Sequence, residues 1–250
     1  MMYLKKFQKF RLVKLLLLGV ICFTIIPSTM AQQSGNQRSR KAAANVMPRL
    51  KTELASLNQD GLKVGNPVFI RIFKETREME VWIENSKTNK YVLFKTYKVA
   101  AMSGKLGPKL KEGDRQAPEG FYFVNRSRMN PSSRFHLAFN VGYPNTYDRA
   151  RGRTGSALMV HGNRVSIGCF AMTDRYIEEI YTLCDLALTN GQPIFRVHSF
   201  PFRMTPERMA KAKGNQWYSF WQNLQTGYDY FEKKKVPPNT TVANRKYVFK

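Results

Sequence analysis

The sequence predicts an α+β fold, in which a run of strands is followed by amphipathic helices. Between residues 66 and 101, apolar side chains alternate with a period of two, as in Val68–Phe73, and this period is typical of strands. Beyond residue 173 the spacing changes to three or four, which predicts one helix face: Ile177, Ile180, Tyr181, Cys184 and Leu188. Hydrophobic residues make up 43% of the 250-residue chain, so a sizeable core can form.

The first 31 residues predict an export signal. Basic residues come first, the apolar run Leu15–Ile26 follows, and Thr29-Met30-Ala31 places small residues at the positions that a signal peptidase reads. The apolar run is shorter than the roughly 20 residues that span a bilayer, and an uncleaved anchor is the alternative. We therefore expect cleavage after Ala31, a mature protein in the periplasm, and membrane contact only through residues 1–31.

Residues 32–62 are expected to link this signal to the folded domain. The polar segment Gln32–Arg40 predicts a loose stretch of chain. Lys41–Asn58 has apolar residues at near-helical spacing, but Pro48 lies within it and would remove a hydrogen bond from a helix. The sequence therefore predicts a short or broken helix, which Asp60-Gly61 ends.

The predicted strands lie in residues 63–200, which we expect to form the main domain. After Val68–Phe73 they are expected at Met79–Ile83, Tyr91–Ala101, Phe121–Asn125, Phe135–Asn140, Ser156–Val160 and Pro193–His198. Asn85–Asn89 is the expected hairpin turn, and Met102–Glu119 is a long loop rich in Gly, Lys and Pro. A loop of this length inside a compact domain is usually functional.

Two helical regions are predicted beyond the central strands. Thr173 or Asp174 caps the first helix, and Gly191 ends it. Thr205-Pro206 begins a helix within residues 201–250, which we expect to form a C-terminal helical extension. An apolar stripe in this extension is explained better by core packing than by sugar binding: Trp217, Phe220, Trp221 and Leu224.

The formal net charge of +24 restricts the class of partner. Five positive and no negative charges lie in residues 1–31, so removing those five leaves +19 on the mature chain. The basic residues are scattered, and no nucleic-acid-binding motif occurs among them. We therefore expect no nucleic acid partner, and an anionic envelope polymer or membrane face in its place, with a solvated basic surface as the alternative.

The strongest chemical signal is a histidine and a cysteine eight positions apart, His161 and Cys169, each beside a glycine. A cysteine nucleophile needs a nearby base and backbone N–H groups that face the reacting carbonyl. His161 follows a short apolar strand, Gly162-Asn163 can turn the chain back, and Cys169 lies shortly before a helix. We interpret Cys169 as the nucleophile and His161 as its base, against the alternative of a buried structural cysteine.

The other cysteines and histidines are expected to be structural. Cys184 lies on the apolar helix face and is predicted to be core, with a disulfide to Cys169 as the alternative. The pairs of ligands at short spacing that form zinc sites are missing from the sequence, and His136 and His198 belong to separate predicted strands. We therefore expect half-buried strand histidines, no metal and no organic cofactor.

His161-Gly162 followed by Ser166-Ile167-Gly168-Cys169 resembles the signature of YkuD-domain L,D-transpeptidases, and most closely that of their YafK-type branch. The resemblance extends over residues 63–250 and includes Pro67–Phe73, Ser103–Lys109, Pro118–Tyr122, Tyr143–Arg149, Pro201–Thr205 and Gly227–Phe231. It implies a mixed β-sandwich with packed helices in an exported, cysteine-dependent enzyme of peptidoglycan.

The resemblance also implies a role for each position of the motif. Cys169 matches the nucleophile, His161 the general base and acid, Gly162 the backbone carbonyl that orients the histidine, and Gly168 an N–H donor to the oxyanion. Substrate-binding positions are expected at four further residues: Ser166, Ser103, Gly104 and Tyr147.

The sequence departs from the common family pattern at three points. The gap between His161 and Cys169 is shorter, Ile167 stands where a basic residue is usual, and Ala171 stands where an arginine is usual. The YafK-type branch shares these departures and includes a member similar to an amidase that detaches a lipoprotein from peptidoglycan. We therefore expect an enzyme that cuts an amide bond between diaminopimelate and an attached protein or peptide.

Three alternatives to this function remain open from the sequence. The first is a transpeptidase that forms 3–3 cross-links or attaches lipoprotein, and the second is a non-catalytic peptidoglycan-binding protein. The third is a general periplasmic cysteine protease. The expected partners are peptidoglycan and, for the favoured amidase, a lipoprotein bound to it.

Overall fold

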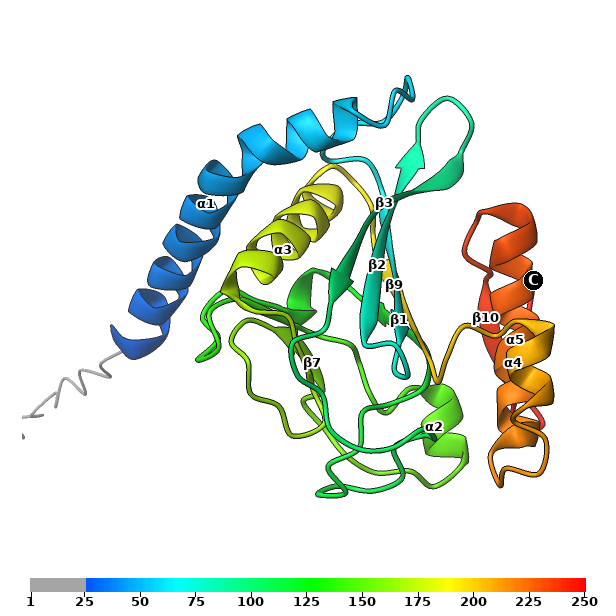
Figure 1. Ribbon diagram of the computed structural model, residues 1–250. Coiled ribbons are helices and arrows are strands. Elements are labelled where there is room, and N and C mark those ends of the chain that lie inside the picture. The colour runs from blue at the N-terminus through cyan, green and yellow to red at the C-terminus, as the bar shows by residue number, and fades with distance from the viewer. Residues whose placement is uncertain (1–25) are drawn as a thin grey trace, which may run out of the picture.

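Two sheets form the centre of the molecule in the computed structural model, which describes residues 26–250 (Figure 1). Side chains from both sheets join one hydrophobic core, and the ring of Phe139 in the smaller sheet contacts that of Phe195 in the larger. The α+β class predicted from the sequence is confirmed. Most of the predicted signal peptide, residues 1–25, lies outside the described residues.

The larger sheet contains β1 (Val68–Phe73), β2 (Glu78–Asn85), β3 (Lys90–Lys98), β4 (Gly120–Val124) and β9 (Phe195–Phe200). Its order is β3-β2-β1-β9-β4, and β1 and β9 form its parallel pair. Every residue of β1 is buried, because the sheet is covered on both faces. The predicted strands and the turn at Asn85–Asn89 are confirmed here.

The smaller sheet contains β5 (Met129–Asn130), β6 (Ala138–Asn140), β7 (Met159–His161) and β8 (Phe170–Ala171), in that order. A short 3₁₀ helix, η1 (Arg126–Arg128), precedes it. The strand predicted at Phe135–Asn140 is shorter than expected. His136 has a φ of +68° in a bend before β6, and such a conformation cannot continue a strand. His136 is therefore not a strand histidine.

The N-terminal helix corrects two predictions. The loose segment and the broken helix are in fact one helix, α1 (Ile26–Ala55), with Pro48 inside it and a visible bend (Figure 1). Packing overrides the proline, because a row of buried residues spaced by four contacts the core beside α3 (Asp174–Thr189): Ala42, Val46, Leu50 and Leu54.

The helix α3 forms as predicted. The side chain of Thr173 caps its N-terminus and accepts from the N–H of Tyr176, and the helix ends just before Gly191. Cys184 on its buried face has no solvent exposure, and both Cys184 and Cys169 are free thiols. The interpretation of Cys184 as a core residue is confirmed.

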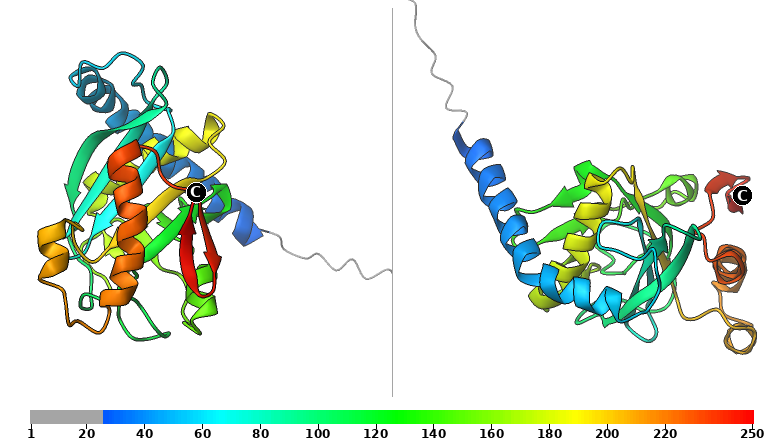
Figure 2. Two further views of the ribbon diagram at one scale, coloured as in Figure 1. Left: turned by 90° about the vertical axis from the view of Figure 1, so that its right-hand side faces the viewer. Right: turned by 90° about the horizontal axis from the view of Figure 1, so that it is seen from above.

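The C-terminal extension is only partly helical. It contains α4 (Pro206–Ala210) and α5 (Tyr218–Lys234), and then a hairpin of β10 (Thr240–Ala243) and β11 (Lys246–Phe249) that the sequence reading missed. Figure 2 shows α5 and this hairpin side by side on the outside of the larger sheet. Trp221 and Leu224 are buried there, which confirms the core reading of the apolar stripe. Between residues 26 and 250, no helix is long and apolar enough to cross a membrane.

Candidate active site

His161 ends β7 (Met159–His161), and Cys169 directly precedes β8 (Phe170–Ala171), the neighbouring strand of the smaller sheet. The two strands are parallel neighbours, with Val160 opposite Phe170 and His161 opposite Ala171. The Sγ of Cys169 accepts from the N–H of Met159 in β7 at 3.4 Å, two residues before His161. After Gly162-Asn163 the chain thus returns beside β7.

Backbone geometry at Gly162 closes this turn. A Cβ at Gly162 would lie 2.5 Å from Asp174 Oδ1 and 2.7 Å from the carbonyl oxygen of Phe135, so only glycine fits there. Asn163 follows with a φ of +65°, and its N–H donates to Asp174 Oδ1 at 2.8 Å. The start of α3 therefore holds the turn that follows His161.

The imidazole of His161 is buried and oriented by its neighbours. Its Nδ1 lies 2.6 Å from the carbonyl oxygen of Gly162, and Phe135 packs against the ring with centroids 4.7 Å apart. The acceptor at Nδ1 fixes the proton on that nitrogen and leaves Nε2 as the basic atom. Burial lowers the pKa of His161, although the Gly162 carbonyl opposes the shift, so the ring is neutral near pH 7.

The thiol of Cys169 is half-buried and contacts backbone groups. Its Sγ accepts from the N–H of Met159 at 3.4 Å and lies 3.7 Å from the carbonyl oxygen of Ala157. Burial raises the pKa of Cys169, while the Met159 N–H and the charge of Lys109 lower it in part. The dipole of α3 would favour a thiolate at its N-terminus, but β8 separates Cys169 from that helix and burial has the larger effect.

Lys109 is a cation whose charge acts on the nucleophile, and the sequence analysis did not predict this role. Its Nζ donates to Asp114 Oδ1 at 2.6 Å and to the carbonyl oxygen of Lys111 at 2.9 Å. It lies in the long loop between β3 and β4, within the family-like segment Ser103–Lys109. The resemblance of this segment to the family was the sequence signal that could have indicated Lys109. Which residues of the loop come near Cys169, however, depends on the fold.

The same loop supports Gly168. The N–H of Gly168 donates to Ser103 Oγ at 2.7 Å, and that hydroxyl donates to the carbonyl oxygen of Arg115. Gly168 has a φ of +95°, which favours glycine. The N–H expected to receive an oxyanion is therefore occupied by Ser103 in this structure, and a substrate carbonyl must displace the hydroxyl to reach it.

Two other predicted substrate-binding residues also make contacts within the protein. Ser166 Oγ donates to the carbonyl oxygen of Cys169 at 2.6 Å and braces the loop before the nucleophile. Gly104 has a φ of +95° and lies against Gln116, whose side chain bonds to the backbone of Lys105. Ser166 therefore shapes the loop before Cys169, and Gly104 shapes the long loop whose Ser103 contacts Gly168.

Tyr147 does not belong to this group. It lies in α2 (Thr146–Ala150), is only 2% exposed, and is stacked between the rings of Phe220 and Tyr247. Both faces of the ring are therefore covered by other aromatic rings. The ring of Tyr147 packs with the hairpin β10–β11 and α5 of the C-terminal extension, and substrate binding by Tyr147 stays a prediction.

The comparison with protein families matches this site to a known domain. A model of the L,D-transpeptidase catalytic domain, YkuD, matches residues 67–198, which include His161 and Cys169. The chain belongs to the YkuD family. The predicted relation to YafK is confirmed as well. The protein YafK of Escherichia coli K12, named as a candidate L,D-transpeptidase, is 46% identical over 185 residues, which are 74% of each chain. The YafK protein of Escherichia coli O157:H7 matches equally.

Solved structures give more distant similarities. A mutant of Pgp2, a helical cell shape determining protein of Campylobacter jejuni, is 21% identical with a TM-score of 0.44. The match covers 72% of this chain but 62% of that one, less than two thirds of its length. Bd1075 of Bdellovibrio bacteriovorus is 18% identical with a TM-score of 0.39, over 72% of this chain and 78% of its own.

Proposed function

We propose that this chain is an exported cysteine enzyme that cuts amide bonds at the diaminopimelate of peptidoglycan stem peptides. The proposal is supported by the contact of Cys169 Sγ with the N–H of Met159 in β7, the strand that ends at His161, inside an L,D-transpeptidase family domain. The periplasm is the compartment in which such a substrate is found, in agreement with the expected signal peptide.

The chemistry follows from the two side chains. Cys169 Sγ attacks the amide carbonyl while His161 Nε2 takes the thiol proton, and the same proton then passes to the leaving amine. The product is a thioester on Cys169, which water or a second amine resolves. The carbonyl of Gly162 keeps His161 in the tautomer that this transfer needs. No metal or organic cofactor enters these steps.

A basic pocket beside the loop suits a substrate with carboxylates. It has a volume of about 670 Å³, and its lining includes Asn163, three cations (Lys98, Arg164 and Arg175) and one carboxylate, Asp174. Asn163 follows the catalytic turn, so this pocket lies next to His161 along the chain. Stem peptides carry several carboxylates, and lysine and arginine side chains bind such groups.

The rim of the loop favours release of an attached protein over cross-linking. Val165 and Ile167 are 56% and 73% exposed and form an apolar rim, while Ala171 is fully buried in β8. Neither family cation is therefore present to hold the carboxylate of an acceptor stem. An apolar rim suits a polypeptide attached to the stem, and hydrolysis should then exceed transfer to a second stem.

The test is to incubate purified protein with sacculi that carry bound lipoprotein, and to analyse muropeptides and released protein by mass spectrometry. We expect the wild-type enzyme to release the protein without forming new cross-links, and Cys169→Ala to release none. Cys184→Ala is the matched control, because it removes a thiol from the core but leaves the site intact. It should keep its activity.

The outcome also decides between the reactions. New diaminopimelate–diaminopimelate cross-links with loss of terminal D-Ala would replace hydrolysis by transpeptidation. Release that persists in Cys169→Ala would contradict the cysteine mechanism. Binding to sacculi without any Cys169-dependent product would favour a non-catalytic peptidoglycan-binding protein.

A further inference from the structure

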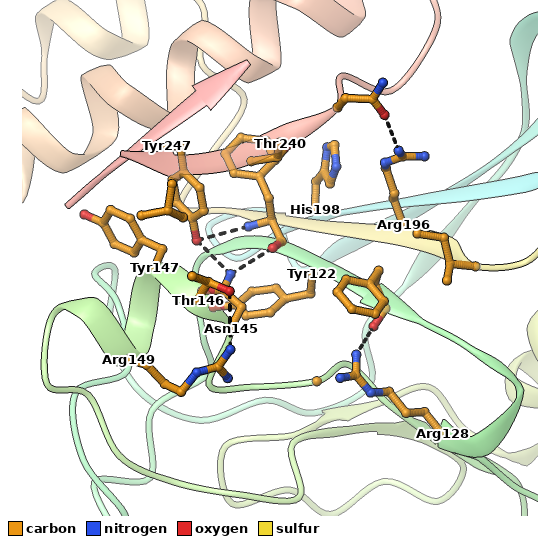
Figure 3. A pocket seen from close by; sticks show the side chains of 16 residues that line it. Tyr122, Arg128, Asn145, Thr146, Tyr147, Arg149, Arg196, His198, Thr240 and Tyr247 are labelled. Carbon is orange, nitrogen blue, oxygen red and sulfur yellow. Dashed lines mark hydrogen bonds between the residues drawn. The ribbon is translucent and has the colours of Figure 1, made fainter. Parts of the chain in front are cut away.

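A second pocket lies on the face of the larger sheet that the C-terminal extension covers (Figure 3). It has a volume of about 370 Å³ and is bounded by β4, β9, the segment around α2, and the hairpin β10–β11. Phe121 projects to this face, because its ring contacts those of Tyr247 and Phe249 in the hairpin. His198 lies beside it, with its ring against that of Phe121. The catalytic motif takes no part in this pocket.

Three arginines in its wall lack acidic partners. Arg128 donates to the carbonyl oxygen of Phe123, Arg149 donates to that of Pro144, and Arg196 donates to Asn239 Oδ1. No Asp or Glu is among the lining residues, and within residues 26–250 none of the three arginines forms an ion pair. Burial and the neighbouring charge of Arg149 lower the pKa of Arg128.

Several buried or half-buried arginines elsewhere in residues 26–250 pair with a carboxylate, whereas these three do not. Arg153 pairs with Asp148 at 2.8 Å, and Arg203 pairs with Glu80 at 2.7 Å. Cations that repel one another in a shared pocket raise the free energy of the unliganded state. A bound anion would relieve that repulsion.

His198 gives an independent indication of a ligand. Its side chain is 1% exposed, lines the pocket, and has no partner at Nδ1 in the part of the chain that the structure describes. The rings of Phe69 and Phe121 pack edge-on against it at 4.6 Å each. An unsatisfied buried polar atom costs free energy, and a pocket ligand is the group that could pair with it.

The placement of the cations indicates what kind of anion fits. Arg128, Arg149 and Arg196 come from η1, α2 and β9, and Figure 3 shows them around the pocket and not converging on one point. A compact phosphate would contact one or two of them. Several separated carboxylates on an extended molecule could pair with each, because guanidinium groups bind carboxylates through two parallel hydrogen bonds.

We propose that this pocket is a second binding site, separate from the catalytic residues, for a peptide that carries several carboxylates. The inference rests on the proposed function in one respect, since the peptidoglycan stem is the ligand of this class that such an enzyme meets. A site of this kind would hold the enzyme on the polymer while Cys169 acts on a neighbouring stem.

The three histidines of the chain allow the two sites to be observed separately. Imidazole signals of ¹⁵N-histidine-labelled Cys169→Ala protein are followed by NMR while a purified disaccharide tetrapeptide is added. Ligand in the second pocket should shift the signal of His198, and ligand at the catalytic loop should shift that of His161. His136, which pairs with Glu178, serves as the internal reference.

Variants then assign the shift to the arginines. Arg128→Gln combined with Arg149→Gln should weaken the binding that His198 reports by at least about tenfold, while the His161 titration stays unchanged. Lys211→Gln combined with Lys213→Gln removes the same charge from exposed positions and should change neither titration. Thermal unfolding of each variant checks that the fold is retained.

Three outcomes would overturn the proposal. The first is a His198 signal that does not move with the peptide, and the second is a shift that the arginine variant leaves unchanged. The third is a shift caused by inorganic phosphate or by phosphatidylglycerol vesicles but not by the peptide. A failure of the catalytic proposal is separate, because it would show as a silent His161 and as sacculi left intact by the wild-type enzyme.

Discussion

The catalytic loop and the seam beneath the C-terminal extension hold polar groups in place in opposite ways. We define the catalytic loop as residues 161–174 and the seam as the contacts around Glu119. In the catalytic loop, backbone hydrogen bonds and positive-φ residues set the shape, and apolar side chains such as Ile167 point into solvent. In the seam, the polar groups are charged, paired and buried among aromatic rings.

The seam is a single cluster around one carboxylate. Glu119 has no solvent exposure and accepts from Lys74 Nζ at 3.0 Å, from the N–H of Gly107 at 2.7 Å and from Trp221 Nε1 at 2.9 Å. Lys74 Nζ also donates to the carbonyl oxygens of Gly107 and Ala117. The cluster thus joins α5 to the loop that carries Ser103 and Lys109 beside the nucleophile.

This difference separates the effects of mutation. Between Asn163 and Cys169 the side chains of the catalytic loop are exposed or half-buried, so their loss should reduce activity more than stability. Charges of the seam have no access to water, so the loss of one partner leaves the other unpaired at a large cost in free energy. The two regions therefore predict different readouts for substitutions of similar size.

The largest effect on stability is expected from Glu119→Gln. The substitution leaves the buried ammonium of Lys74 without its counter-charge, and burial already lowers the pKa of that group. We expect a loss of about 3–5 kcal/mol in the free energy of unfolding, measured by urea denaturation. Glu75→Gln is the control, since its ion pair with Arg208 is partly exposed and should contribute less than about 1 kcal/mol. Equal losses in the two variants would contradict the distinction.

The catalytic loop should show the opposite response. His161→Gln is expected to lower the rate at least about 100-fold, the usual contribution of a positioned general base, and to lower the urea midpoint less than Glu119→Gln does. His136→Gln should keep the rate, because that side chain pairs with Glu178 at the surface side of α3. The measurement is initial release of product from sacculi. If His136→Gln lowered the rate as much as His161→Gln does, the general base would have to be assigned to His136 and not to His161.

Local patterns predicted the parts of the fold that local contacts determine. The strand period at Val68–Phe73, the cap at Thr173 and the frame from His161 to Cys169 are each set within a few residues, and all were found. Tyr147 could not be placed, because its environment comes from Tyr247, which lies 100 positions further along the chain. The hairpin that carries Tyr247 turns at Asn244 and Arg245, both with positive φ, and neither residue is a glycine that would signal such a turn.

The N-terminal helix also depends on contacts that local sequence patterns do not reveal. Pro48 lowers the helix propensity of Lys41–Asn58, and a prediction from propensity alone breaks the helix there. The row of buried residues around Leu50 gains more from packing beside α3 than the proline costs. Likewise, Lys109 gains its influence on Cys169 from the path of the long loop, which depends on Glu119 and Trp221.

The smallest expected effect is a shift in the pH dependence of activity. It distinguishes a resting site with a neutral His161 and Cys169 from one with an imidazolium–thiolate pair. Burial lowers the pKa of His161 and raises that of Cys169, so both groups are neutral near pH 7. As the pH falls, His161 stays unprotonated through the ordinary histidine value of about 6.5, and activity should persist below it. A preformed imidazolium–thiolate pair would give the reverse shifts.

Alkylation of Cys169 by iodoacetamide tests this directly, because Cys184 is fully buried and burial raises its pKa far above the ordinary value. Burial raises the pKa of Cys169 above the ordinary cysteine value of about 8.5. The rate of alkylation should therefore continue to rise with pH beyond about 8.5. Lys109→Met removes a cation that lowers the pKa of Cys169, so it should move the midpoint to still higher pH, whereas Lys109→Arg should not. Asp114 keeps its backbone N–H donors in both variants, which limits the structural damage. A rate that levels off at neutral pH would mean that the thiolate exists before substrate arrives, and that His161 is then the acid of the first step and not its base.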